Sequence, residues 1–289
     1  MNLSSPHLRG SLLTAAGVLV LTPDGLLVRL ISADVWTLLA WRGFFFATAI
    51  FGFYTLKYGK GVIIRTMAMG RMGVIAGFFF GGSTIFFVQS LNNTSVANTL
   101  VIIATAPLFA ALISHIFLKE KVEPSTWIAI LVSSGGIAFI FKESLSSDYL
   151  LGDIFALACA ICIASQITTV RRARHIDMVP SLGLGSLVVA SIAFFSATSI
   201  KISTTDLSLL MLLGLVVLPI AFGLITIGPR YIPAAEVSLL MLLETFLGPI
   251  WVWLVIGEHP SINTIIGGGL VLLTLAGHTL YNARRKRTA

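Results

Sequence analysis

Three ionisable side chains interrupt long apolar stretches of the sequence: Asp24, Arg42 and Glu244. If these stretches cross a membrane, each charge costs about 2.5–3.5 kcal/mol at a helix centre on insertion scales. Asp24 and Arg42 fall in the outer halves of two consecutive antiparallel helices, so they can form an ion pair. That pair either fixes helix packing or faces a substrate cavity. Glu244 has no basic residue at its depth except Arg42, which favours a role in binding.

Aromatic and small polar side chains recur on common helix faces around these charges. A helix returns to the same face after about 3.6 residues, and aromatic walls with a few polar groups line small-molecule pockets. The alternative is that individual phenylalanines meet lipid or other helices. The predicted substrate-binding residues are Glu244, Arg42, Asp24, Phe79, Ser83, Phe86, Asn98, Thr105, Phe109 and Trp251.

Four apolar stretches contain a proline, namely Pro23, Pro107, Pro219 and Pro249. Each proline removes an intrahelical hydrogen bond and can free a carbonyl toward a cavity. For Pro219 a plain kink is the favoured interpretation.

Other motifs point away from enzymatic chemistry. Cys159 and Cys162 form a Cys-x-x-Cys pair, but inside an apolar helix and without further ligands. The five histidines have no metal-binding spacing, and the sequence has no P-loop and no hydrolase motif. We therefore expect no metal, no cofactor and no enzymatic activity.

The composition indicates what kind of protein carries these residues. Of 289 residues, 56% are apolar and 11% are charged, against about 25% charged in a typical soluble domain. Mean hydropathy is +0.97. These values exclude an ordinary soluble enzyme and a disordered chain, and two cysteines exclude a disulfide-rich domain. The sequence predicts an all-α polytopic membrane protein.

Ten apolar runs can serve as transmembrane helices, because each approaches the length of about 20 residues that a span needs. Their lack of period-two alternation disfavours a β-barrel. The runs are Ser11–Ile31, Val35–Leu56, Gly70–Leu91, Val96–Phe117, Thr126–Phe141, Leu151–Val170, Pro180–Ile200, Leu207–Pro229, Ile232–Ile256 and Ile262–Leu280.

The basic residues predict the orientation of these helices. With ten spans and a cytoplasmic N-terminus, fifteen of the 19 Lys and Arg residues fall on the cytoplasmic side, as the positive-inside rule requires. Lys142, Lys201 and Arg29 fall outside, and Arg42 lies within a span. We expect a multi-pass protein of the bacterial inner membrane with both termini in the cytoplasm. The net charge of +7 is then a topology signal, and no nucleic-acid partner is expected.

The two halves of the chain resemble each other. Residues Val96–Ile140 resemble Ala234–Gly277 at an offset of about 138, which matches Glu120 to Glu258, and each segment contains one mid-span proline, Pro107 or Pro249. The N-terminal parts align with a slightly larger offset, which matches Arg29 to Arg171. Two repeats, 1–143 and 144–289, with five helices each must have opposite orientations. Inverted repeats are typical of secondary transporters, whose substrate sites lie near the midplane between the repeats.

Two segments resemble a known family. The first runs from Ser90 through Ala106-Pro107-Leu108 to Phe117-Leu118-Lys119-Glu120, and the second includes Leu239–Leu243, Glu244 and Ile256-Gly257-Glu258. Both are similar to EamA domains of the drug/metabolite transporter superfamily, and size and layout resemble amino-acid exporters of the YddG type. One departure is that Glu244 is followed by Thr245 in place of the proline frequent in the family. We therefore expect the break in the ninth helix about one turn further out, toward Pro249.

The resemblance implies a secondary transporter that exports small metabolites, with amino acids as the favoured substrates, by alternating access. We expect a monomer whose partners are a small-molecule substrate and the lipid bilayer. An exporter of organic cations or drugs is the nearest alternative. An intramembrane lipid-modifying enzyme is the alternative from another class. The choice between proton antiport and facilitated diffusion stays open.

Overall fold

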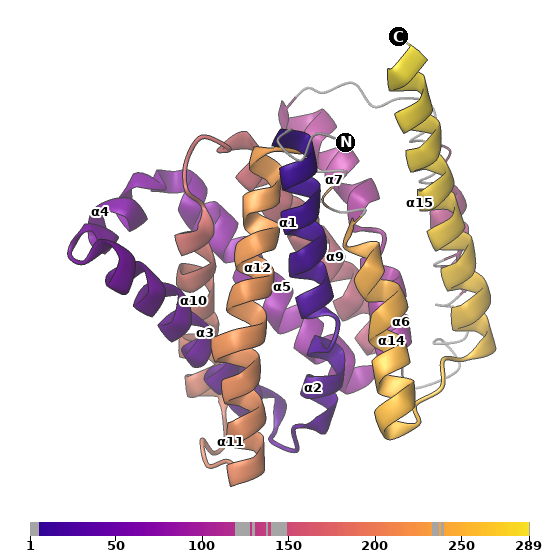
Figure 1. Ribbon diagram of the computed structural model, residues 1–289. Coiled ribbons are helices and arrows are strands. Elements are labelled where there is room, and N and C mark those ends of the chain that lie inside the picture. Colours follow the sequence, from indigo (N-terminus) through magenta and orange to yellow (C-terminus); the bar gives the residue numbers. More distant parts are fainter. Residues whose placement is uncertain are drawn as a thin grey trace.

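The computed structural model describes residues 6–118, 128, 131–136, 138–139, 149–232, 237 and 240–288. Within these residues the regular elements are all helices (Figure 1). Seven helical segments are long and apolar enough to span a membrane: Pro6–Leu30, Val35–Tyr58, Gly70–Asn93, Val96–Phe117, Leu150–Arg172, Val179–Ser196 and Thr204–Arg230. Two shorter apolar helices follow, Leu242–Ile256 and Ile262–Thr274. These lengths support a multi-pass membrane protein.

The observed segments agree with the apolar runs of the sequence to within a few residues, except in two places. The predicted fifth helix is described only at residues 128, 131–136 and 138–139, and these residues are helical. The start of the predicted ninth helix, with Glu236, also lies mostly outside them, as do Lys119, Glu120 and the loop at 142–148.

Two of the spans are interrupted by turns. Helix α1 (Pro6–Leu21) is followed by a turn at Thr22 and Pro23, and α2 (Asp24–Leu30) begins directly after it. Helix α6 (Val96–Ile103) is separated from α7 (Ala106–Leu118) by a turn at residues 104–105, just before Pro107. The first turn of a helix tolerates proline, because a backbone N–H there has no intrahelical partner to lose. Both prolines therefore start a new helical segment.

A π-helical turn interrupts a third span. This span consists of α11 (Thr204–Met211), η1 (Leu212–Val217), α12 (Leu218–Ile227) and the short η2 (Gly228–Arg230). Gly214 lies within η1 against α3 (Val35–Tyr58), where an added Cβ would come 2.6 Å from Phe45 Cβ and 3.3 Å from the Arg42 carbonyl oxygen. The missing side chain therefore lets the two backbones approach closely beside Arg42.

Helices from the two halves of the chain pack directly against each other. Helix α5 (Gly70–Asn93) contacts both α9 (Leu150–Arg172) and α10 (Val179–Ser196), and α10 also packs on α3. A Cβ added to Gly185 of α10 would lie only 2.3 Å from the Gly77 carbonyl oxygen of α5. Glycine at these positions allows the close backbone approach that membrane helices use for association.

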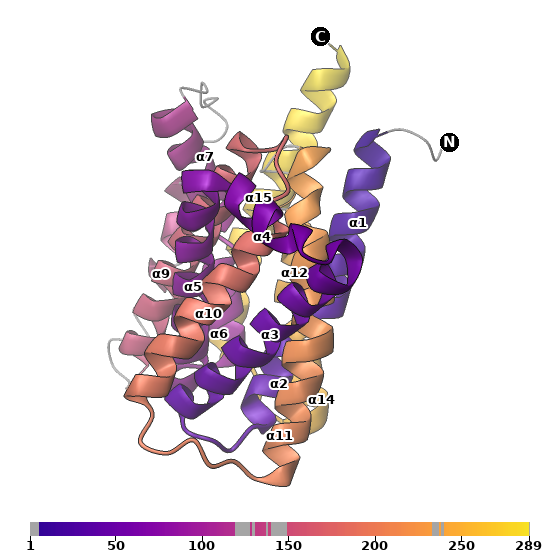
Figure 2. The ribbon, with the colours of Figure 1, turned by 90° about the vertical axis from the view of Figure 1, so that its left-hand side faces the viewer.

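The bundle has two distinct ends (Figures 1 and 2). The beginning of α1 and the end of α15 (Ile262–Thr288) lie at the same end, which we call the termini end. The Arg9 guanidinium lies there over the Tyr231 ring, and Arg171 donates to the Pro229 carbonyl oxygen. At the other end, the Arg29 end, α2 approaches the segment between α14 (Leu242–Ile256) and α15.

Candidate functional site

Asp24 and Arg42 form a bidentate ion pair in the interior of the bundle. Arg42 Nη1 lies 2.7 Å from Asp24 Oδ1, and Nη2 lies 2.8 Å from Oδ2. Both side chains are about 3% exposed. Asp24 is the first residue of α2, so the break at Pro23 brings its carboxylate to α3. The pairing expected from the sequence is confirmed.

Arg42 retains one nitrogen that this pair does not use. Its Nε is buried and has no hydrogen-bond partner among the described residues. A buried donor without a partner is costly, so it marks a place where a water or ligand acceptor would stabilise the protein.

Glu244 lies in the first turn of α14 and is 8% exposed. None of the described residues donates a hydrogen bond to its carboxylate. The expected helix break near Pro249 is wrong: α14 runs without interruption from Leu242 to Ile256, and the turn lies at Met241 instead. Membrane helices accommodate an internal proline when neighbouring groups compensate for the lost bond. The break therefore precedes Glu244 and places it close to a helix N-terminus.

Asp24, Arg42 and Glu244 line one small cavity of about 40 Å³. Such a volume holds water but is far below the roughly 300–1,000 Å³ of ligand pockets, so the cavity is too small for a substrate in this structure. Its walls come from both halves of the chain. The remaining lining residues are Leu21, Ser83, Thr84, Phe87, Leu100, Ile103, Cys159, Ile163, Phe222 and Met241.

Three aromatic rings close the cavity toward the termini end. Phe222 lines the cavity and lies 5.1 Å from Phe80 and 6.3 Å from Phe46, between ring centroids. Phe46 and Phe80 are 5.5 Å apart. Phe46 follows Arg42 by one helical turn, and Phe80 precedes Thr84 by one turn, so both rings lie beyond the cavity on that side.

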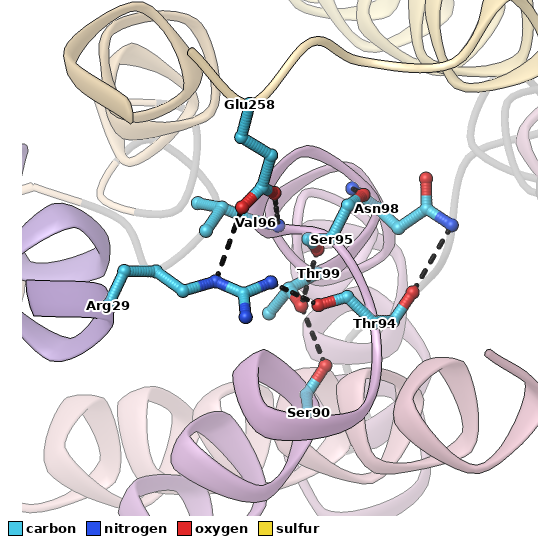
Figure 3. A network of polar contacts seen from close by, with 8 residues as sticks. All are labelled: Arg29, Ser90, Thr94, Ser95, Val96, Asn98, Thr99 and Glu258. Carbon is cyan, nitrogen blue, oxygen red and sulfur yellow. Dashed lines mark hydrogen bonds and ion pairs between the residues drawn. The ribbon is translucent and has the colours of Figure 1, made fainter. Parts of the chain in front are cut away.

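A polar network closes the bundle at the Arg29 end (Figure 3). Arg29 Nε lies 3.3 Å from Glu258 Oε2, and Arg29 Nη2 donates to the Thr94 carbonyl oxygen at 2.7 Å. Glu258 Oε1 accepts from the backbone N–H of Val96 at 2.8 Å. Because Val96 begins α6, the carboxylate also neutralises the positive end of that helix dipole. The network thus joins α2, α6 and the segment after α14.

A larger polar cavity of about 710 Å³ lies around this network. Arg29, Asn93, Asn98, Glu258 and His259 are among its lining residues. Its size falls in the range of ligand pockets, and the network separates the small central cavity from the solvent side of this end.

Comparison with known proteins identifies the family. The EamA-like transporter family matches residues 8–142 and 150–280. The chain belongs to this family. As an EamA-family protein it is similar to the uncharacterized transporter YoaV of Bacillus subtilis, with 25% identity over 74% of this chain and 76% of that protein.

Two further relatives are less completely covered. The uncharacterized transporter YdfC of Bacillus subtilis is 24% identical over 66% of this chain, and a riboflavin transporter of Vibrio cholerae is 25% identical over 65%. The matches span 64% of each of these two relatives. The chain in a solved crystal structure aligns over 95% of this chain and 98% of its own length, with a TM-score of 0.68 and 18% sequence identity. That similarity shows the fold alone.

The structure brings together only part of the binding set predicted for this EamA-family chain. Asp24, Arg42, Ser83 and Glu244 line the central cavity. Trp251 lies just beyond it, where its indole N–H donates to Thr22 Oγ1 at 3.1 Å.

The other predicted residues lie outside the central cavity. Phe86 stacks on Phe155 with centroids 6.1 Å apart, and Phe79 contacts Phe78. Asn98 lies at the Arg29 end, where it bonds to Thr264 and Thr94. Thr105 donates to the Ile102 carbonyl oxygen at the α6–α7 turn, and Phe109 is half-buried in α7.

Phe87, Phe222 and Cys159 line the cavity but were not among the predicted residues. Phe87 lies one turn after Ser83 on α5, so the two residues share a helix face. Extending the face of the predicted residue Ser83 by one turn would therefore have found Phe87. Cys159 was discounted as a redox or metal group, and here its thiol donates to the Ser83 carbonyl oxygen at 3.3 Å. No sequence signal marked Phe222, which lies in an apolar span between Pro219 and Gly223. The absent side chain of Gly248 makes room for Leu100, since an added Cβ would lie 2.5 Å from Leu100 Cδ1.

Proposed function

We propose that this protein exports amino acids, including aromatic and apolar ones, across the bacterial inner membrane by alternating access. The supporting observation is the central cavity, where Asp24, Arg42 and Glu244 are buried together among helices of both halves. Buried charges in a membrane protein mark substrate or ion pathways. The cavity is too small for a substrate in this structure, so alternating access requires the helices around it to move apart.

A zwitterion needs an acceptor for its ammonium group and a donor for its carboxylate. The Glu244 carboxylate, to which no described residue donates, takes the first role. Arg42 takes the second, because its Nε is unpaired while its two Nη atoms hold Asp24. Phe87 and Phe222 supply the apolar wall for the side chain of the substrate.

The proposed topology has ten helices in two inverted five-helix repeats, 1–143 and 144–289, with both termini cytoplasmic. The termini end then faces the cytoplasm and carries Arg9, Arg171 and Arg230. The Arg29–Glu258 pair closes the periplasmic side, and the Phe46–Phe80–Phe222 cluster closes the cytoplasmic side.

An organic cation is the second candidate substrate. Asp24 neutralises Arg42, so an ionised Glu244 leaves the cavity with one net negative charge. That balance suits a cation, and the rings of Phe87 and Phe222 can hold one by their faces.

Purified protein in liposomes tests these proposals. Labelled amino acids, an organic cation and riboflavin, the last chosen because one relative transports it, are offered separately. We expect chemically unchanged amino acids to cross faster than in protein-free liposomes, and Glu244→Gln to lower that rate while folded protein is retained. Full transport by both Glu244→Gln and Glu244→Ala would show that the carboxylate takes no part. Transport of the cation alone would favour the second candidate.

A further inference from the structure

A groove of about 560 Å³ opens between α3 and α12 toward the termini end, separate from the central cavity. Its floor is apolar and includes Ile50 and Phe53 of α3 and Pro219, Ile220 and Gly223 of α12. Phe53 and Ile220 are 58% and 47% exposed. Both helices belong to membrane spans, so this exposed apolar surface faces the hydrocarbon of the bilayer.

Gly223 creates much of the space in the groove. No atom lies within 4 Å of a Cβ added to Gly223, and Pro219, one turn earlier, also lacks a long side chain. The surface of α12 is therefore recessed between Pro219 and Gly223, and an alkyl chain can lie in this recess. Phe46, Phe80 and Phe222 pack together between this groove and the central cavity.

The end of the groove nearest the termini is polar and basic. Lys57 lines it, and its Nζ lies 5.2 Å from the Tyr58 ring centroid and 5.6 Å from that of Phe53. No described acid forms an ion pair with Lys57. The guanidinium of Arg65 lies over the ring of Tyr58, which also lines the groove, 3.8 Å from the ring centroid.

One acid also faces this end, but its oxygens are already engaged. Asp177 Oδ2 accepts from the Tyr54 hydroxyl at 2.6 Å, and Oδ1 accepts from Arg230 at 3.1 Å. Asp177 therefore offsets Arg230, and the positive charge of Lys57 and Arg65 remains. An apolar channel with cations at the depth of the headgroups matches a lipid with a negative headgroup.

We propose that this groove binds an anionic phospholipid from the leaflet at the termini end. One acyl chain lies along Pro219 and Gly223, and the phosphate lies beside Lys57. This inference concerns lipid binding and does not depend on which substrate is transported. Its test measures lipid binding directly, so its failure is distinct from failure of the transport proposal.

Native mass spectrometry of the full-length protein in detergent, titrated with phosphatidylglycerol or phosphatidylcholine, provides the test. We expect one phosphatidylglycerol to bind more tightly than phosphatidylcholine. Gly223→Leu fills the groove and should weaken that binding at least tenfold. Gly52→Leu is the matched control, because Gly52 of α3 also has no atom within 4 Å of an added Cβ but does not line the groove.

Lys57→Gln, at an exposed position, tests the headgroup contact even if Gly223→Leu does not fold. It should reduce the preference for phosphatidylglycerol about fivefold, the effect of one basic residue near an anionic lipid surface. Unchanged phosphatidylglycerol binding by folded Gly223→Leu, or an unchanged preference in Lys57→Gln, would overturn the proposal. Loss of transport by Gly223→Leu with lipid binding intact would also overturn it and assign the groove to the substrate path.

Discussion

The guanidinium of Arg29 and the carboxylate of Glu258 face each other with Nε 3.3 Å from Oε2, and Glu258 at the same time caps the first N–H of α6 (Figure 3). Glu258 thus makes an ionic contact and a capping contact. Substitutions can separate the two, because glutamine keeps an oxygen acceptor for Val96 but loses the charge, whereas alanine loses both.

We expect Glu258→Ala to open the Arg29 end more than Glu258→Gln does. Cys159 is a native reporter, since it lines the central cavity. In a Cys162→Ala background, the rate at which a small water-soluble thiol reagent modifies Cys159 should increase from wild type through Glu258→Gln to Glu258→Ala. Removing Cys159 as well must abolish the signal. Equal rates in all three proteins would mean that Glu258 does not control access.

The Asp24–Arg42 pair should show strong coupling in a double-mutant cycle. Removing one partner of a buried ion pair costs about 3–5 kcal/mol, whereas an apolar replacement of both is near neutral. We expect Asp24→Asn and Arg42→Met each to lower the midpoint of thermal unfolding in detergent, and the double variant to recover much of the loss. Additive losses would argue against coupling. Transport should stay impaired in the double variant if Arg42 also binds the substrate, as proposed above.

The topology is testable with single cysteines in a protein that lacks Cys159 and Cys162. His259 and Lys60 are both exposed and lie in segments between helices. We expect an impermeant maleimide to label His259→Cys in intact cells, but to label Lys60→Cys only after the membrane is permeabilised. The reverse pattern would invert the proposed orientation. Labelling of both in intact cells would contradict the helix count.

Gly185 should be intolerant of even a methyl group. An added Cβ would lie 2.3 Å from the Gly77 carbonyl oxygen, and backbone cannot move aside as a flexible side chain can. Overpacking of this kind costs about 1–3 kcal/mol, so Gly185→Ala should lower the thermal midpoint by several degrees. Gly269→Ala, where an added Cβ meets no atom within 4 Å, should leave it unchanged. Equal midpoints would show that α5 and α10 can separate without cost.

The helical segments and the ion pair were predictable from the sequence, but the cavity face of each helix was not. Apolar length determines a span, and a charge such as Asp24 is conspicuous in an apolar run, so both signals are strong. Helix α5, in contrast, is apolar on several sides, and of its phenylalanines only Phe87 lines the cavity, while Phe86 packs on Phe155. Spacing alone cannot separate a face that meets a cavity from one that meets another apolar helix.

The sequence prediction put the helix break near Pro249, after Glu244, because it took proline as the mark of a break. Pro249 lies inside α14, whereas the turn falls at Met241, which has no special backbone chemistry. At the offset of 138, the first-half equivalent of Met241 is Ile103, which directly precedes the α6–α7 turn, and there Pro107 does follow the break. The position of a break thus depends on packing around the span as well as on the residue that permits it.

The π-helical turn η1 determines where the α11–α12 span can pivot. Its Gly214 holds the span against α3 beside Arg42, while farther along, toward Gly223, the two helices diverge around the groove. A π-helical turn contains one residue more than an α-helical turn. A backbone N–H in this turn can therefore change its carbonyl partner by one residue while the span stays helical. We expect η1 to act as a hinge. A small rotation of α12 about Gly214, beside the ion pair, would then displace the far end of the span, at Arg230, by a larger distance.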